Sequence, residues 1–177
     1  MQGRFLAIQY LDQSDKLRGS FFAYGIFKPG QLAFRQIREF VAEMDSEATV
    51  TGTLYERDGL PILKAGGTGR VKGTLLTFRP DAQAEAYARV NMLGPEAQYR
   101  WRTVQVCTAM GNREAMALLG IKPDKGSIPL ESDDWDGASG PLFTSALEII
   151  DEALENNWEF AWDLKPLFRL EMAYLLL

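Results

Sequence analysis

The most informative stretch of this sequence is Phe21-Phe-Ala-Tyr-Gly-Ile-Phe-Lys-Pro-Gly30. Its first half continues a predicted strand over residues 19–25, and Gly25 and Gly30 allow the chain to turn sharply after that strand. Backbone N–H groups left unpaired in such a turn form a concavity that suits a carboxylate or another anion. The alternative is a strand end that simply packs into the core, and the stretch alone leaves both interpretations open.

Further elements follow on both sides of this stretch. Residues rich in β-branched and aromatic types predict strands over 48–55 and 71–78, separated by a glycine-rich loop at 65–69. Alternation predicts a strand over 99–107, and a hairpin turn at residues 111–112 leads into another over 115–121. Helical spacing predicts helices over 32–41 and 81–92, and a short apolar run predicts a strand over 5–10. The sequence therefore predicts an α+β fold built on a small mixed β-barrel with peripheral helices.

The composition excludes several classes of protein. The 177 residues carry a net charge of −5 and 46% apolar residues, which suits one globular domain and gives no electrostatic basis for binding nucleic acid or an anionic membrane. Neither a membrane-spanning apolar run nor a secretory signal is evident, and a single cysteine cannot form an internal disulfide, so we expect a cytoplasmic protein. The chain contains no histidine, which excludes Ser-His-Asp catalysis and His-ligated zinc. Any proton transfer must use a carboxylate, Lys, Tyr or backbone group.

Four motifs in order resemble the γ-glutamylcyclotransferase-like (AIG2-like) family, and they cover residues 19–120. The family's first strand ends in a Tyr-Gly-(Ser/Thr)-Leu turn with a further glycine. Three later segments of this chain resemble later strands of the family. The matching segments are Tyr24-Gly-Ile-Phe27 with Gly30, Val50-Thr-Gly-Thr-Leu-Tyr55 with Gly59-Leu-Pro61, Val71-Lys-Gly73, and the strand opened by Tyr99 with its partner near Ala115. The resemblance implies cleavage of a γ-glutamyl amide into 5-oxoproline and an amine, with no metal or organic cofactor.

The resemblance also implies a binding site for the γ-glutamyl group. Its floor would be Tyr24, Gly25, Ile26 and Phe27, followed by Gly30, with Tyr99 opening the neighbouring strand. Ile26 replaces the family's Ser or Thr, so one hydroxyl donor is lost. The family often carries an arginine two residues after the tyrosine, where this chain has Trp101. A shift of register would make Arg102 its stand-in, although Arg100 and Arg102 also suit a solvent-facing pair.

The expected catalytic glutamate is replaced. In the family it closes the second helix in a Leu-Asp-x-x-Glu-Gly pattern, and this chain has Val90-Asn-Met-Leu-Gly-Pro-Glu96 there. Alignment of Asn91 with the family's Asp puts Gly94 at the catalytic position, and alignment of Gly94 with the family's Gly puts Leu93 there. Neither residue can transfer a proton. Glu96 is the nearby carboxylate that remains, as a relocated base or as a solvated loop residue, and Glu85 is a weaker candidate. A catalytically inactive homologue that binds a small ligand or a protein partner is therefore the alternative function.

The remainder of the chain extends this core. Residues 121–142 predict an irregular connection, in which Asp133-Asp-Trp-Asp136 is a charged surface loop, and residues 143–177 predict C-terminal helices. The aromatic C-terminal segment either covers an open side of the barrel or forms a dimer contact. The sequence leaves the oligomeric state open.

Overall fold

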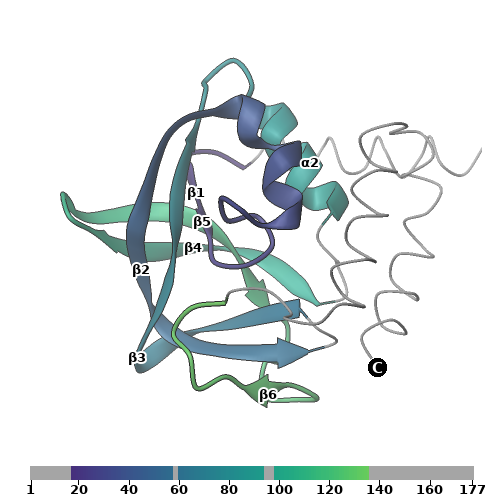
Figure 1. The fold of residues 1–177 in the computed structure, drawn as a ribbon, viewed down its shortest axis with the longest axis vertical. Coiled ribbons are helices and arrows are strands. Elements are labelled where there is room, and N and C mark those ends of the chain that lie inside the picture. The colour runs from purple at the N-terminus through teal and green to yellow at the C-terminus, as the bar shows by residue number, and fades with distance from the viewer. Residues whose placement is uncertain (1–16, 58–59, 94–97, 136–177) are drawn as a thin grey trace, which may run out of the picture.

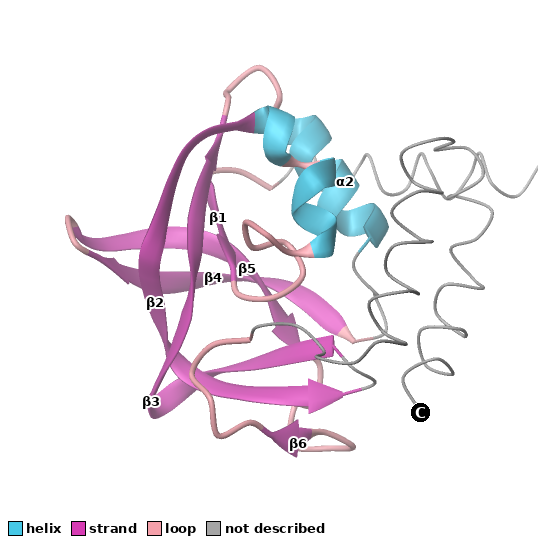
Figure 2. Ribbon diagram, viewed as in Figure 1, coloured by secondary structure: helices cyan, strands magenta, loops and turns pink. Residues whose placement is uncertain are grey.

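The computed structural model describes residues 17–57, 60–93 and 98–135, and these residues build a β-barrel with helices on one side (Figures 1 and 2). The strands are β1 (Ser20–Ala23), β2 (Val41–Arg57), β3 (Leu60–Phe78), β4 (Tyr99–Thr108), β5 (Gly111–Gly120) and β6 (Ile128–Pro129). The helical elements are the 3₁₀ helices η1 (Leu32–Gln36) and η2 (Arg38–Phe40) and the α-helix α2 (Gln83–Leu93). Within these ranges, no helix has both the length and the apolar character needed to cross a membrane.

The barrel closes because β2 and β3 pair with each other as well as with the other strands. The strand order is β3-β1-β5-β4-β2, and the β2–β3 pairing joins its two ends, with β6 added beside β2. β1 runs parallel to β5, whereas the other pairings are antiparallel. The small mixed β-barrel expected from the sequence is thereby confirmed.

Two apolar clusters lie on opposite sides of the strands, since successive side chains of a strand point to opposite faces. Phe22 belongs to the cluster inside the barrel, and Phe21 to the cluster under α2 and the 3₁₀ helices. The inner cluster comprises Phe22, Tyr24, Ala48, Val50, Leu54, Leu63, Val71, Leu75, Val104, Val106, Ala115, Ala117 and Trp135. The outer cluster comprises Phe21, Ala23, Phe27, Ala33, Ile37, Phe40, Leu76, Phe78, Ala82, Ala86, Tyr87, Val90 and Leu118.

Three expected elements differ in the structure. The helix expected over residues 32–41 is two short 3₁₀ helices, and β2 already begins at Val41. The glycine-rich loop expected at 65–69 lies within β3, where the pairing shifts between Thr51↔Arg70 and Gly52↔Ala65 and leaves residues 66–69 as a bulge. The turn expected at residues 111–112 is already part of β5, because Thr108 pairs with Gly111.

The described part of the irregular connection is attached to the barrel by Arg57. Its guanidinium donates to the carbonyls of Ile121 at 3.1 Å, Lys125 at 3.2 Å and Gln98 at 3.3 Å. The surface loop expected at residues 133–136 is correct for Asp133 and Asp134, whose side chains are exposed. It is wrong for Trp135, because this side chain is only 3% exposed and lies in the inner cluster. The expected strand at residues 5–10, the turn at 58–59 and the helices at 143–177 lie outside the described residues.

Candidate functional site

The turn after β1 forms the first wall of the site. The Lys28 N–H donates to the Gly25 carbonyl at 2.9 Å and closes the turn, and the Ala33 N–H donates to the Ile26 carbonyl at 2.9 Å. Within the described ranges, the N–H groups of Ile26 and Phe27 have no protein acceptor. This pocket turn, residues 25–28, therefore presents two free N–H donors, as an anion-binding concavity requires.

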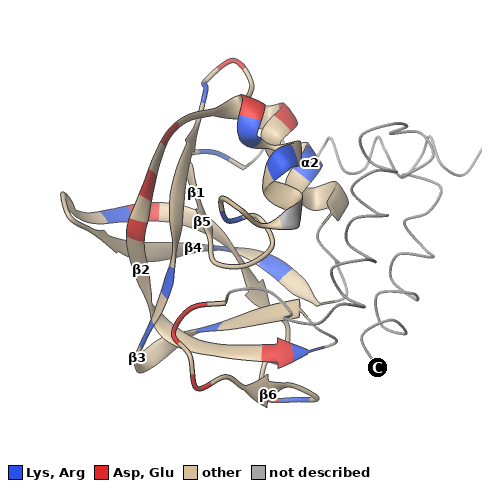
Figure 3. Ribbon diagram, viewed as in Figure 1, with Lys and Arg blue, Asp and Glu red and all other residues tan. Residues whose placement is uncertain are grey.

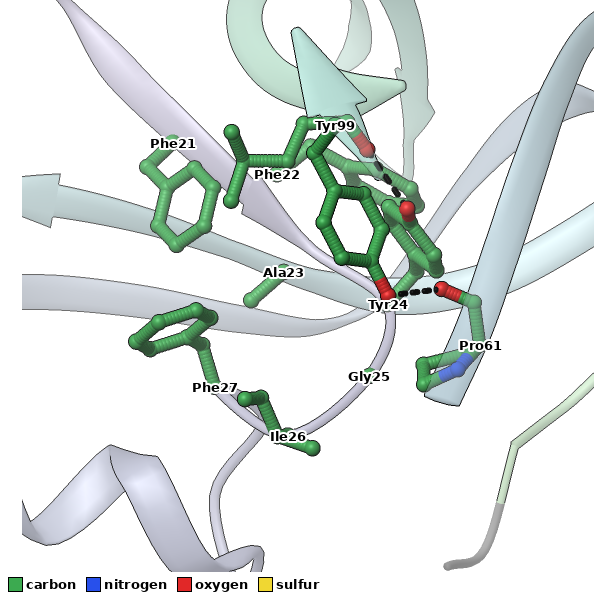
Figure 4. Close-up of a pocket in the computed structure, with 10 residues that line it drawn as sticks. Phe21, Phe22, Ala23, Tyr24, Gly25, Ile26, Phe27, Pro61 and Tyr99 are labelled. Atoms are coloured by element: carbon green, nitrogen blue, oxygen red, sulfur yellow. Dashed lines mark hydrogen bonds between the residues drawn. The ribbon is translucent and has the colours of Figure 1, made fainter. Parts of the chain in front are cut away.

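Pro61 forms the opposite wall and explains why residue 25 is a glycine. A Cβ added to Gly25 would lie 2.3 Å from the Pro61 Cγ, which is far inside van der Waals contact. Figure 4 shows Gly25 facing Pro61, with Ile26 and Phe27 following along the same turn. The Pro61 ring at the start of β3 therefore leaves no room for a side chain at position 25 of the pocket turn.

Two tyrosine hydroxyls fix these walls to the barrel. Tyr24 donates to the Leu118 carbonyl and accepts from the Leu63 N–H at 3.3 Å, and Tyr99 donates to the Pro61 carbonyl at 2.7 Å (Figure 4). Burial raises the pKa of the Tyr24 hydroxyl, and likewise that of Tyr99, well above the usual value of 10.0. Both side chains are thus neutral hydrogen-bond donors at physiological pH and position the pocket walls.

Replacement of Tyr24 by Phe should lower the free energy of unfolding by about 1–3 kcal/mol, because the Leu63 N–H and the Leu118 carbonyl lose their shared partner. The variant should also be less sensitive to alkali. The folded chain holds the proton of Tyr24 at a raised pKa, whereas the unfolded chain releases it near 10.0. The stabilisation is therefore complete below pH 10 and declines as pH rises further, by about 1.4 kcal/mol per pH unit for each such tyrosine.

Urea unfolding of the wild type and Tyr24→Phe at several pH values from 8 to about 11 tests both effects. The wild-type stability should fall more steeply above pH 10 than that of Tyr24→Phe. Equal slopes in the two proteins would contradict a Tyr24 hydroxyl that stays protonated in the folded state.

These walls enclose a small apolar pocket. Its lining residues are Phe21, Phe22, Ala23, Tyr24, Gly25, Ile26, Phe27, Pro61, Tyr99 and Leu118. The cavity volume is about 30 Å³, and about 340 Å³ when the open space at its mouth is included. None of these lining residues is charged, and Figure 3 marks the positions of the charged residues on the strands, helices and loops around the pocket.

The structure brings most, but not all, of the sequence-predicted site residues together. Tyr24, Gly25, Ile26, Phe27 and Tyr99 line the pocket. Gly30 lies beyond the pocket turn at a positive φ of 85° and is not part of the lining.

Arg102 is exposed, donates to the Trp101 carbonyl at 3.3 Å and does not line the pocket. Arg100 is exposed as well.

The structure describes some of the residues around the expected base position, namely those up to Leu93. Asn91 accepts a hydrogen bond from the Trp101 indole N–H at 2.6 Å, and Leu93 packs on the outer cluster. Glu85 pairs with Arg89 at 3.0 Å on the surface of α2, away from the pocket lining. Glu96 and Gly94 lie outside the described residues.

Sequence reasoning missed the contributions of Pro61 and Leu118. Leu118 acts through its backbone carbonyl, which any residue type supplies. Pro61 acts through its carbonyl and its ring, and the Gly59-Leu-Pro61 motif carried the signal for it. Among the residues that the structure describes, no group of three potential metal ligands comes together.

The sequence matches no protein-family model and no curated protein. Solved structures do match. An AIG2-like protein from mouse superposes with a TM-score of 0.51 at 16% identity, over 70% of this chain and 90% of that one. The uncharacterised protein PH0828 from Pyrococcus horikoshii gives a TM-score of 0.50 at 21% identity, over 67% and 91%.

A third solved structure aligns over a similar share of this chain. YkqA from Bacillus subtilis aligns with a TM-score of 0.49 at 17% identity, over 66% of this chain, which spans 39% of the length of YkqA. The barrel topology, the turn after β1 and the matches to the mouse and Pyrococcus proteins agree with the motifs of the sequence. The chain has the γ-glutamylcyclotransferase-like (AIG2-like) fold.

Proposed function

We propose that the pocket binds the γ-glutamyl group of a γ-glutamyl amide and that the chain releases it as 5-oxoproline together with a free amine. The observation that carries this proposal is the meeting of the pocket turn, Pro61 and Tyr99 around one apolar pocket. Two of its lining residues, Ile26 and Phe27, have N–H groups without an acceptor among the described residues. Fold alone does not specify an activity, so the proposal rests on these groups.

The two kinds of surface in the pocket suit the two parts of a γ-glutamyl group. The N–H groups of Ile26 and Phe27 would receive its α-carboxylate, since charge-assisted hydrogen bonds from backbone N–H groups are strong. The apolar side chains of Phe27 and Ile26 would contact its methylene carbons. The volume of the cavity means that such a group would also fill the space at the mouth.

The reaction is an intramolecular aminolysis. The α-amine nitrogen attacks the γ-carbonyl carbon and forms the C–N bond of the lactam, and the C–N bond to the leaving amine then breaks. In our proposal the Glu96 carboxylate takes a proton from the α-ammonium and afterwards gives it to the leaving nitrogen. The second proton that the attacking nitrogen loses as it becomes the lactam N–H also passes to the leaving amine, which departs as an ammonium ion, so no proton is gained or lost. Glu96 precedes Tyr99 by three residues in the sequence, a stretch that spans at most roughly 11 Å when extended.

A second function is a pocket that binds the same kind of ligand without cleaving it. Leu93, one of the two residues aligned with the usual base, is an apolar side chain packed on the outer cluster. Ile26 adds no hydroxyl donor to the pocket. A chain that relies on Glu96 alone for proton transfer would become a binding protein if that carboxylate did not reach the ligand.

Incubation of the purified full-length protein with a panel of γ-glutamyl amines and γ-glutamyl dipeptides tests the proposal. We expect release of 5-oxoproline and a stoichiometric amount of amine from at least one of them. A panel in which no compound is cleaved, although the compounds bind, would support the non-catalytic function instead.

A further inference from the structure

The chain that follows β6 returns to the barrel and is attached to it at three points. The Leu130 N–H donates to the Leu54 carbonyl at 2.9 Å, and the Asp133 carbonyl accepts from the Lys72 N–H at 2.7 Å. Trp135 is 3% exposed and lies inside the barrel. Residues 130–135, called the strap below, follow β6 as the last coloured segment in Figure 1.

The strap and the pocket share the inner cluster. Trp135 and Tyr24 both belong to that cluster, and Ile26 of the pocket turn and Leu130 of the strap pack against it. Because protein interiors are close-packed, the position of a buried indole constrains the side chains around it. The strap is therefore placed to influence the pocket turn from inside the barrel.

A direct contact also joins the strap to the pocket turn. The Lys28 Nζ forms an ion pair with the Asp134 carboxylate. The same residue closes the turn through its own N–H, which donates to the Gly25 carbonyl at 2.9 Å. The Lys28 side chain is only 13% exposed, so loss of its partner would leave a largely buried charge unpaired.

Asp133, next to Asp134, forms an exposed ion pair away from the pocket turn. Asp133 pairs with Lys72 at 3.1 Å, and both side chains are about half exposed, at 49% and 57%. Exposed pairs of this kind contribute little to stability. Asp134 thus pairs with the pocket turn and Asp133 pairs on the surface. Replacement of Asp133 is therefore a matched control for replacement of Asp134.

We propose that Asp134 is a positioning residue of the pocket: through Lys28 it holds the turn that presents the free N–H groups of Ile26 and Phe27. The strap, anchored by Trp135, provides the fixed point for this contact. The inference concerns the shape of the ligand-free turn, and only its effect on ligand affinity rests on the proposed function.

Amide hydrogen exchange of the ligand-free, full-length protein tests the inference. The Lys28 and Ala33 amides report on the turn because they donate to the Gly25 and Ile26 carbonyls. In Asp134→Ala these two amides should exchange at least roughly tenfold faster, whereas amides in the centre of β3 should keep their protection. Asp133→Ala should leave all of them unchanged.

A charge-swapped variant, Lys28→Glu with Asp134→Lys, should restore slow exchange at the Ala33 amide. Unchanged exchange in Asp134→Ala would overturn the inference. So would an equal acceleration in Asp133→Ala, or a loss of protection spread evenly over the barrel.

The affinity for 5-oxoproline separates this inference from the proposed function. If the wild type binds 5-oxoproline, Asp134→Ala should bind it at least roughly tenfold more weakly and Asp133→Ala equally well. If 5-oxoproline binds to none of the proteins, the proposed function fails, and the exchange rates alone decide the role of the strap.

Discussion

Replacement of Glu96 by Gln should reduce the rate of 5-oxoproline release by about 10²–10⁴-fold, the usual contribution of a positioned general acid–base. The amide keeps the size of the side chain but neither accepts a proton from the α-ammonium nor returns one to the leaving nitrogen. The absence of histidine leaves carboxylates, Lys and Tyr as proton carriers. The two pocket tyrosines have hydroxyls that are hydrogen-bonded to carbonyls and raised in pKa.

Glu85→Gln is the matched control for this experiment. Glu85 is exposed on α2 and engaged with Arg89 at 3.0 Å, so its loss should leave the rate of release nearly unchanged. Single-turnover measurements with the best substrate of the panel compare the chemical step in the two variants and the wild type. A Glu96→Gln protein that releases 5-oxoproline at the wild-type rate would show that another group carries the proton.

Replacement of Gly25 by Ala should lower the free energy of unfolding by about 1–3 kcal/mol and abolish binding in the pocket. The added Cβ would lie 2.3 Å from the Pro61 Cγ, so the pocket turn and the start of β3 must separate. Separation would also strain the hydrogen bond from the Tyr99 hydroxyl to the Pro61 carbonyl. Urea unfolding measures the first effect, and titration with 5-oxoproline measures the second.

Gly126→Ala separates the effect of crowding from that of any glycine replacement. Gly126 has a positive φ of 68°, and an added Cβ would meet nothing within 4 Å. Its replacement should cost about 1 kcal/mol through backbone strain and leave ligand binding intact. If Gly25→Ala were as stable as Gly126→Ala and still bound the ligand, the close contact with Pro61 would not shape the pocket.

The strands of the barrel were predictable because β-branched and aromatic residues alternate along them, as in residues 99–107. The structure of residues 32–41 was not predictable, and the spacing of their apolar residues explains why. Phe34, Ile37 and Phe40 recur every three residues, which suits a 3₁₀ helix of three residues per turn as well as an α-helix. The sequence pattern does not separate the two, and the early start of β2 at Val41 decides for the shorter form.

The pocket turn was predictable from Tyr24 and Gly25, but its surroundings depend on contacts between residues distant in sequence. Tyr24 reaches Leu118, and Tyr99 reaches Pro61, through hydrogen bonds to carbonyls that leave no mark on the residue type. Trp135 was hidden for a similar reason. Its acidic neighbours Asp133 and Asp134 indicate a surface loop, and they do lie at the surface, whereas the Trp135 indole is buried in the inner cluster.

The most direct test of a γ-glutamyl site at the pocket turn is a titration of the ¹⁵N-labelled full-length protein with 5-oxoproline, followed through its backbone amide signals. A γ-glutamyl site at the pocket turn should give saturable shifts centred on the Ile26 and Phe27 amides, with smaller shifts at residues adjoining Pro61 and Tyr99. This pattern is expected whether or not the chain is an enzyme. Saturable shifts located elsewhere on the barrel, or no shifts with either 5-oxoproline or a γ-glutamyl amide, would contradict a γ-glutamyl site at the pocket turn.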